Sequence, residues 1–392
     1  MQLAQTDDEK EFRARARAWL VANIPKTKRP NTTGPEARAF DTAWQRKQYD
    51  GGWAGVSWPK EAGGLGLSLT HQLIWHEEYA LAGAPPPGVM FIALNHGGPT
   101  LIVRGSEAQK QKHLPKILRG EEVWCQGFSE PGAGSDLAGI QCRAVVEDGH
   151  LVVNGSKIWT SIGHTADMQE LVVRTDPTLG RHKGMTWAIC DMTYEGVTVK
   201  PLKVITEDTY LAQVFYDNVR IPLENVVGGV NNGWSVAMST LSLERGLAML
   251  PHQMEMVSKL EKLLELARVR IGPDGVRKAI DHEDIAARLA RLRAECAATR
   301  AMTYMSVSRG LRQDIPGPEG SLVALQHAEL VQKVKALSLD ILGPEYLDYE
   351  GGVGWPREYL DSFKYTIAGG TSEIRRNIIA ERILGLPRSN VQ

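Results

Sequence analysis

The sequence lacks the features by which several classes of protein are first recognised. Its 392 residues include only four cysteines, which are widely spaced and form no C-x-x-C pair: Cys125, Cys142, Cys190 and Cys296. This spacing excludes a disulfide framework and a zinc site, and it predicts reduced, partly buried thiols. The longest unbroken apolar run is Val89 to Leu94, far below the roughly 20 residues that a membrane-spanning helix needs.

An excess of charge of either sign is also missing. Lysine and arginine total 45 and aspartate and glutamate total 46, a net charge of −1, which argues against a nucleic-acid partner. Acidic residues follow Thr6 where a signal peptide would have basic and then apolar ones. We therefore expect a cytoplasmic protein without a membrane partner. An apolar content of 43% with 23% charged residues is typical of globular chains.

The usual nucleotide-binding signatures are absent as well. The chain has no G-x-x-x-x-G-K-[ST], and no G-x-G-x-x-G between a strand and a helix. A glycine-rich run, residues 63–66, falls in a region that reads as helical, so a Rossmann fold is a poor interpretation. His71 and His76 are five residues apart instead of four, which favours two helix histidines over a metal site.

The pattern of residues divides the chain into an α-helical domain (1–122), a β domain (123–230) and a helical bundle (231–392). Capping boxes at Thr6 and Ser106 open helices of the first part. In the middle part, Asp148-Gly149 predicts a hairpin, and residues 217–222 are predicted to carry the chain out of the sheet. At roughly 150 residues per domain, two to three domains suit the length. Predicted helices of the last part are 234–269, 281–309, 321–342, 357–367 and 371–384.

Four stretches contain residue types that suit a binding site. Gln126 to Asp136 ends in Pro-Gly-Ala-Gly-Ser-Asp, and such a loop exposes backbone amides to a phosphate or a flat heterocycle, or simply joins two strands. Trp159, followed by Thr160 and Ser161, could cover an aromatic cofactor or pack in the core. Both interpretations of each stretch remain open from the residues alone.

The other two stretches lie in the last part of the chain. Glu244 and Arg245 are adjacent within an apolar helix, which is costly unless they are partnered or functional. Gly369-Gly370 followed by Thr371-Ser372 predicts a tight turn into a helix N-terminus, where amides can face a polar group.

Together and in this order, the four stretches resemble the acyl-CoA dehydrogenase family. The resemblance covers essentially the whole chain, including its α–β–α domain order, and the runs 129–136 and 369–377 are highly specific. It implies a multidomain α+β fold with an N-terminal helical domain, a middle β-barrel or sandwich, and a C-terminal four-helix bundle. It also implies α,β-dehydrogenation of an acyl-CoA, as in β-oxidation of fatty acids or steroid side chains.

The resemblance implies a bound FAD, an acyl-CoA substrate and electron-transfer flavoprotein as the electron acceptor. A carboxylate would take the pro-R α-proton while a hydride goes to flavin N5, giving a trans-2-enoyl-CoA. Substrate contacts would come from Ser135, Arg245 and Gly369. The FAD contacts that the resemblance implies are Gln126, Phe128, Ser129, Ser135, Trp159, Thr160, Ser161, Arg270, Thr371 and Glu373.

The chain departs from the family pattern at three places. Many members have their catalytic glutamate where this chain has Gly369, whereas a second group has it on the first long bundle helix, just before an arginine. Glu244 matches that second position, so we expect Glu244 to be the base. Arg270 matches an arginine that reaches a neighbouring subunit's FAD, but the Phe-Gly that should follow is missing, and Gly343-Pro344 replaces a Gly-Gly.

These departures leave alternatives to a fully competent enzyme. Similar divergence occurs in bacterial members that form α2β2 heterotetramers and act on bulky acyl groups, so either a homotetramer or such a heterotetramer is expected. The chain could instead be a non-catalytic or half-site subunit. A flavin oxidase, monooxygenase or desulfinase on the same fold is a further alternative.

Overall fold

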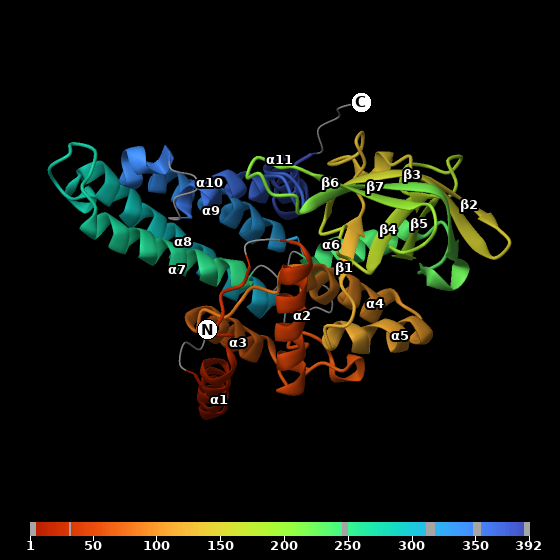
Figure 1. Ribbon diagram of the computed structural model, residues 1–392, viewed down its shortest axis with the longest axis horizontal. Coiled ribbons are helices and arrows are strands. Elements are labelled where there is room, and N and C mark those ends of the chain that lie inside the picture. The colour runs from red at the N-terminus through yellow and green to blue at the C-terminus, as the bar shows by residue number, and fades with distance from the viewer. Residues whose placement is uncertain (1–4, 31–32, 245–249, 311–317, 348–353, 388–392) are drawn as a thin grey trace. The chain divides into compact units, whose positions relative to one another are not determined.

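The computed structural model describes residues 5–30, 33–244, 250–310, 318–347 and 354–387 (Figure 1). By their internal contacts the residues form two compact units. The first comprises Met1–Gln72 and Ala84–Glu244, and the second Leu73–Gly83 and Arg245–Gln392. Each unit is described by itself.

Two helices of the first unit begin at the N-cap residues that the sequence predicts. Both predicted capping boxes are present: Thr6 accepts from the Glu9 amide at 3.2 Å, and Ser106 accepts from the Gln109 amide at 3.2 Å. A single π-helical turn, η3 (Ala93–Gly97), precedes α4. The α-helices of this unit are α1 (Asp7–Asn23), α2 (Pro35–Asp50), α4 (Gly98–Arg104), α5 (Glu107–Leu118) and α6 (Gly233–Glu244), together with the start of α3 (Leu69–Leu81).

The sheet of the first unit has the strand order β6-β7-β3-β2-β4-β5-β8, with β1 paired in parallel to β4. Asp148 and Gly149 have φ values of 47° and 73° in the predicted β2–β3 hairpin. The strands are β1 (Trp124–Gly127), β2 (Arg143–Glu147), β3 (His150–Ser161), β4 (Met168–Arg174), β5 (Met185–Asp191), β6 (Val197–Leu202), β7 (Leu211–Pro222) and β8 (Val226–Val227).

One prediction for this sheet is wrong. Residues 217–222 do not leave it, because β7 runs to Pro222 and pairs with β3, His150 lying opposite Pro222. Val219 and Ile221 are both fully buried, so the alternation of apolar residues continues through this segment.

Apolar cores lie on both sides of the sheet. One includes Trp58, Trp124 and Trp187 and joins the helices to the sheet, where Thr100 on α4 hydrogen-bonds Thr240 on α6 at 2.8 Å. The other is built from alternate strand residues such as Leu151, and it contains Cys142 and Cys190. The four cysteines are free and fully buried, more so than predicted.

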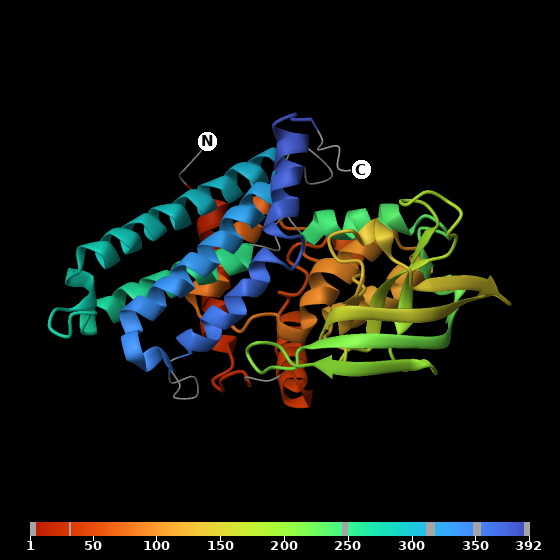
Figure 2. The same cartoon turned by 90° about the horizontal axis from the view of Figure 1, so that it is seen from above.

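The second unit is a helical bundle, in which α7, α8 and α9 run side by side (Figure 2). Two predicted helices are present but change type along their length: 357–367 is an α-helix to Ser362 and then a 3-10 turn to Thr366, and 371–384 is an α-helix to Ile378 and then a π turn to Ile383. The bundle helices are α7 (Leu250–Val269), α8 (Glu283–Gly310), α9 (Gly320–Leu342), α10 (Trp355–Ser362) and α11 (Ser372–Ile378).

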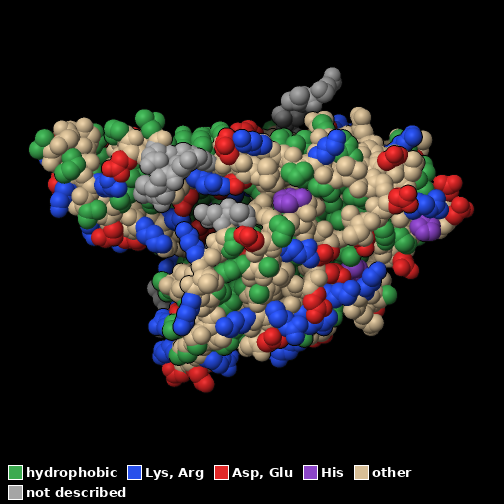
Figure 3. Space-filling view, viewed as in Figure 1, with side chains coloured by type: hydrophobic (Ala, Val, Ile, Leu, Met, Phe, Trp, Pro, Cys, Tyr) green, Lys and Arg blue, Asp and Glu red, His purple; other side chains and the backbone are tan. Residues whose placement is uncertain are grey.

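No helix in the described ranges is long and apolar enough to cross a membrane. On the face shown in Figure 3, basic and acidic side chains are interspersed, in keeping with the near-zero net charge of the sequence.

Candidate functional site

The Pro-Gly-Ala-Gly-Ser loop of the first unit is fixed by one buried carboxylate. Glu130 and Ala133 exchange two backbone hydrogen bonds of 3.0 Å, which close a tight turn just after β1. The Glu130 side chain accepts from the amides of Gln141 at 2.7 Å and Cys142 at 2.9 Å, and from Lys157 Nζ at 2.7 Å. The loop is therefore held to the strands on both sides of it.

Lys157 is the cation of this arrangement, and its side chain is fully buried on β3. It also donates to the Phe128 carbonyl oxygen at 3.0 Å. Burial lowers the pKa of Lys157, whereas the neighbouring Glu130 acts to raise it. A buried pair of this kind contributes little net stability but is costly to break on one side only, because the other charge is then left buried without a partner.

The far side of the same loop is open. A Cβ added to Gly132 or Gly134 would meet nothing within 4 Å, and Ser135 is exposed. Asp136, the last residue of the motif, forms an ion pair with Arg181. Exposed amides next to small side chains suit a phosphate group. The Phe128 ring lies in the core, so its backbone is the part that a ligand could reach.

Trp159 occupies an unusual position on β3. The register of β3 against β7 shifts between Lys157 and Thr160, and Trp159 has φ of 61°, in the left-handed region. Its side chain is 57% exposed, which rules out the core-packing interpretation. A left-handed conformation costs a residue with a Cβ about 1–2 kcal/mol, and such outliers concentrate at binding sites.

The residues around Trp159 provide polar groups. The amide of Ile158 donates to the Ser129 carbonyl at 2.9 Å, so the motif loop and the tryptophan are neighbours. Thr160 is fully buried, and its hydroxyl has no hydrogen-bond partner in the described part of the chain. Ser161 is partly exposed. An exposed indole, an unpartnered hydroxyl and an open loop fit an aromatic cofactor with phosphate groups, and FAD is such a molecule.

In the second unit the predicted glycine turn is present. Gly369 and Gly370 have φ of 65° and 100°, and Thr371 caps α11 by accepting from the Ile374 amide at 3.2 Å. The Gly369 amide has no backbone partner among the described residues. The exposed Glu373 has a lowered pKa because its own backbone amide and the Thr371 hydroxyl donate to its carboxylate.

Arg375 supports this turn, and its role was not predicted. Its guanidinium donates to the carbonyl oxygens of Tyr365 at 3.0 Å and Ala368 at 2.9 Å. It is buried, and it lies within the run 369–377, directly after Ile374. A buried arginine that donates to backbone carbonyl oxygens anchors the turn. The buried Lys157 on β3 has the same kind of role in the first unit.

Of the remaining predicted residues, the structure places the side chain of Arg270 but not those of Glu244 and Arg245. Arg270, just past the end of α7, forms an ion pair with Glu345 of its own chain. Glu244 is the last residue of α6, and its side chain and the whole of Arg245 lie outside the described residues. The predicted residues are thus split between the units: the loop and β3 residues are brought together in the first, and Gly369, Thr371 and Glu373 in the second.

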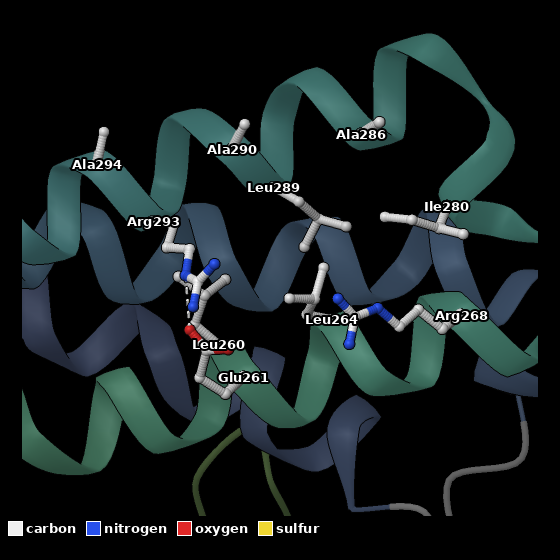
Figure 4. Close-up of a pocket in the computed structure, with 10 residues that line it drawn as sticks. All are labelled: Leu260, Glu261, Leu264, Arg268, Ile280, Ala286, Leu289, Ala290, Arg293 and Ala294. Carbon is white, nitrogen blue, oxygen red and sulfur yellow. Dashed lines mark ion pairs between the residues drawn. The ribbon is translucent and has the colours of Figure 1, made fainter.

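A groove between α7 and α8 contains none of the predicted site residues (Figure 4). Its floor is apolar, with Leu260, Leu264 and Leu289, and Arg293 forms an ion pair with Glu261 at 2.8 Å on its edge. No group of acidic, histidine or cysteine side chains in the described part of the chain could hold a metal ion.

Comparison with known proteins gives consistent matches along the chain. Models of the acyl-CoA dehydrogenase N-terminal, middle and C-terminal domains match residues 6–121, 125–219 and 231–384. Acyl-CoA dehydrogenase IpdE1 of Mycobacterium tuberculosis is 36% identical, covering 97% of this chain and 98% of the relative.

Solved structures agree with these matches. A chain of the Tcur3481-Tcur3483 steroid ACAD superposes with a TM-score of 0.85 and 30% identity, covering 99% of this chain and 100% of that one. A chain of the ChsE4-ChsE5 complex from Mycobacterium tuberculosis has a TM-score of 0.84 and 30% identity, with both chains covered completely.

Proposed function

Because the chain belongs to the acyl-CoA dehydrogenase family, we propose that it converts an acyl-CoA thioester to a trans-2-enoyl-CoA with FAD as its cofactor. The chain is an acyl-CoA dehydrogenase, and dehydrogenation of an acyl-CoA is its general reaction. The single observation that carries the cofactor assignment is Trp159, an exposed indole in a left-handed bulge beside a buried, unpartnered hydroxyl.

When bound, the flavin supplies the hydride acceptor, its N5. Trp159, Thr160 and Ser161 would line the ring, and the amides around Gly132 and Gly134 would face the pyrophosphate. Thr371 and Glu373 are further proposed contacts, at the N-terminus of α11, where backbone amides favour an acceptor. Ser135, exposed at the end of the loop, is proposed to meet the CoA.

The proton chemistry is assigned to Glu244. Its carboxylate would remove the pro-R α-proton, an assignment that rests on its place just before Arg245 in the sequence. The Gly369 amide is the proposed donor to the thioester carbonyl oxygen, where negative charge develops as the proton leaves. Substrate binding that excludes water would raise the pKa of the Glu244 carboxyl and bring it nearer to the working pH. Arg245 is proposed to hold this geometry.

The acyl group, the electron acceptor and the assembly are also proposals. The relatives named above include a steroid enzyme and a two-protein complex. We propose a bulky acyl-CoA as substrate, electron-transfer flavoprotein as acceptor, and assembly either with itself or with a second chain of the same fold.

One observation favours a second candidate function, a half-site subunit. Arg270 is the residue proposed to reach a neighbouring subunit's FAD, yet it is paired with Glu345 of its own chain. Glu345 follows Gly343-Pro344, one departure from the family pattern, and Arg270 precedes the segment that lacks the Phe-Gly, another departure. Under this candidate, some flavin sites of the assembly would be lost while the chain supports a partner's site.

A panel of acyl-CoA thioesters, from short straight chains to steroid side chains, tests the proposal. The purified protein should be yellow, and one class of thioester should bleach the flavin absorbance anaerobically. A protein that carries FAD but is bleached by no member of the panel would contradict the dehydrogenase proposal and favour the half-site candidate.

A further inference from the structure

A buried polar cluster lies directly behind Gln126, and the proposed reaction does not use it. Strands β1 and β4 run parallel with Gln126 and Glu170 in register, so their side chains lie on the same face of the sheet. Glu170 is fully buried, and His96, on the π turn η3, is 3% exposed. Such π turns are frequent at functional sites.

The contacts of this cluster fix the orientation of an amide. Gln126 Nε2 donates to Glu170 Oε1 at 2.7 Å, and His96 Nδ1 lies 3.3 Å from the same oxygen. The two nitrogens are 3.2 Å apart, on one side of the carboxylate. A carboxylate oxygen accepts hydrogen bonds, so the NH2 end of Gln126 must face Glu170. The Gln126 carbonyl oxygen then points away from the cluster.

That oxygen is available to a ligand. Gln126 is partly exposed, and no donor to its Oε1 is found among the described residues. The amide also stands at the start of the motif that continues through Ser129 and the open loop. Its orientation is therefore set from the buried side, and its acceptor is left for a ligand of the motif.

Burying this carboxylate has no evident purpose in packing alone. Carboxylates are costly to bury, and an apolar residue in the middle of β4 would pack equally well. The same unit offers a comparison: His113 and Glu122 form a second buried pair, with Nδ1 and Oε2 2.8 Å apart, and Glu122 also accepts from Trp124 Nε1 at 3.2 Å. That pair touches none of the predicted cofactor residues, so it serves only the core.

We propose that Glu170 and His96 are positioning residues that hold the Gln126 amide with its oxygen toward the flavin, as the acceptor of a ring N–H. This inference rests on the proposed function, because it takes FAD as the ligand of the motif. The isoalloxazine offers N3–H in both redox states and N5–H only when reduced. An acceptor at N3–H strengthens FAD binding in both states, whereas one at N5–H raises the two-electron potential.

The experiment compares three variants of the full-length, FAD-loaded protein. Glu170→Gln replaces the carboxylate by an amide that can present either its oxygen or its NH2, so Gln126 loses its fixed orientation. Gln126→Met removes the acceptor at a partly exposed position while keeping the side-chain length. Glu122→Gln is the matched control, because it removes a carboxylate from the other buried His–Glu pair.

Each variant is measured for its FAD dissociation constant and for its two-electron potential, by reductive titration against a reference dye. If the Gln126 oxygen accepts from N3–H, Glu170→Gln and Gln126→Met should both weaken FAD binding by about tenfold. If it accepts from N5–H, both should shift the equilibrium between reduced and oxidised flavin by about tenfold. The second change corresponds to about 30 mV. Glu122→Gln should change neither.

The proposal is overturned if Gln126→Met keeps the wild-type affinity and potential, or if Glu122→Gln shifts them as much as Glu170→Gln does. If Glu170→Gln does not fold, Gln126→Met decides alone. Measurements on the wild-type protein distinguish failure of the proposed function from failure of the Gln126 proposal. FAD that binds but is not bleached by any acyl-CoA contradicts the proposed function and leaves these binding and potential measurements valid, whereas a protein that binds no FAD overturns both.

Discussion

Trp159 offers the sharpest test of where the cofactor lies. A tryptophan side chain has roughly 150–250 Å² of surface, and 57% of this residue is exposed. About half to all of that exposed area would be covered by a stacked ring. At about 25 cal/mol per Å² the contact is worth roughly 1–3 kcal/mol, or about ten- to a hundredfold in affinity. Trp159→Ala should weaken FAD binding by this factor.

The left-handed backbone at this residue allows a second, diagnostic substitution. Trp159→Gly also removes the ring, but glycine adopts φ of 61° without the cost of about 1–2 kcal/mol that alanine or tryptophan bears there. Both variants should therefore lose FAD affinity similarly, while Trp159→Gly should be more resistant to urea than Trp159→Ala. Different losses of affinity with equal stabilities would mean that the bulge, not the ring, controls binding.

The assay is equilibrium binding of FAD to the apoprotein, followed by quenching of flavin fluorescence. Tyr49→Ala provides the control, since Tyr49 is an aromatic side chain of the same unit, 38% exposed and far from the motif in sequence. It should bind FAD like the wild type. A dissociation constant unchanged in both Trp159 variants would refute the placement of the ring.

Three further predictions follow from other residues. Glu244→Gln should keep its FAD but slow anaerobic flavin reduction by an acyl-CoA at least about a hundredfold, and reduction at the wild-type rate would show that another group is the base. Arg270→Ala should keep the wild-type ratio of FAD to protein and lose less than about 1 kcal/mol of stability, because its partly exposed ion pair with Glu345 lies within one chain; loss of FAD would show that Arg270 reaches a neighbouring subunit instead. Burial, together with His252 and Arg375, lowers the pKa of His327 to about 3. Its neutral form is thus stabilised by folding, so stability is complete above the unfolded pKa of about 6.5 and falls by about 1.4 kcal/mol per pH unit as the pH drops toward 3. In urea unfolding, His327→Phe should lose less stability between pH 7 and pH 5 than the wild type or the surface variant His182→Gln, and an equal loss would contradict the assignment.

Features of the site that depend on neighbouring residues could be predicted from the sequence. The tight turn at Gly369-Gly370 and the Thr371 cap follow from residue types within four positions, and both are present. The Asp148-Gly149 hairpin is of the same kind. In such cases the steric freedom of glycine and the short side chains of Asp and Thr decide the backbone conformation, whatever packs around it.

Features that join distant segments could not be predicted. Glu130 and Lys157 are 27 positions apart, and His96 and Glu170 are 74 apart, so no periodicity connects them. The sequence alone did not decide whether Trp159 is exposed or buried, for a related reason. Alternation along β3 assigns faces only while the register holds, and the shift between Lys157 and Thr160 reverses that assignment.

Two of the departures from the family pattern, the missing Phe-Gly after Arg270 and Gly343-Pro344, lie together in the structure. Arg270 and Glu345 are 75 positions apart, yet their side chains form an ion pair, which brings the segment that lacks the Phe-Gly and Gly343-Pro344 to the same end of the bundle. If Arg270 does not contact the FAD of a neighbouring subunit, its positive charge needs another partner. The Glu345 carboxylate provides that partner at this end of the bundle. The pair thus places both segments at one contact, so that a change in either alters the surroundings of the other. In the first unit, Glu130 pairs with Lys157, and Glu170 accepts from Gln126 behind the motif. Because these contacts fix the loop and the Gln126 amide from the buried side, they support the proposal that the chain itself holds a flavin.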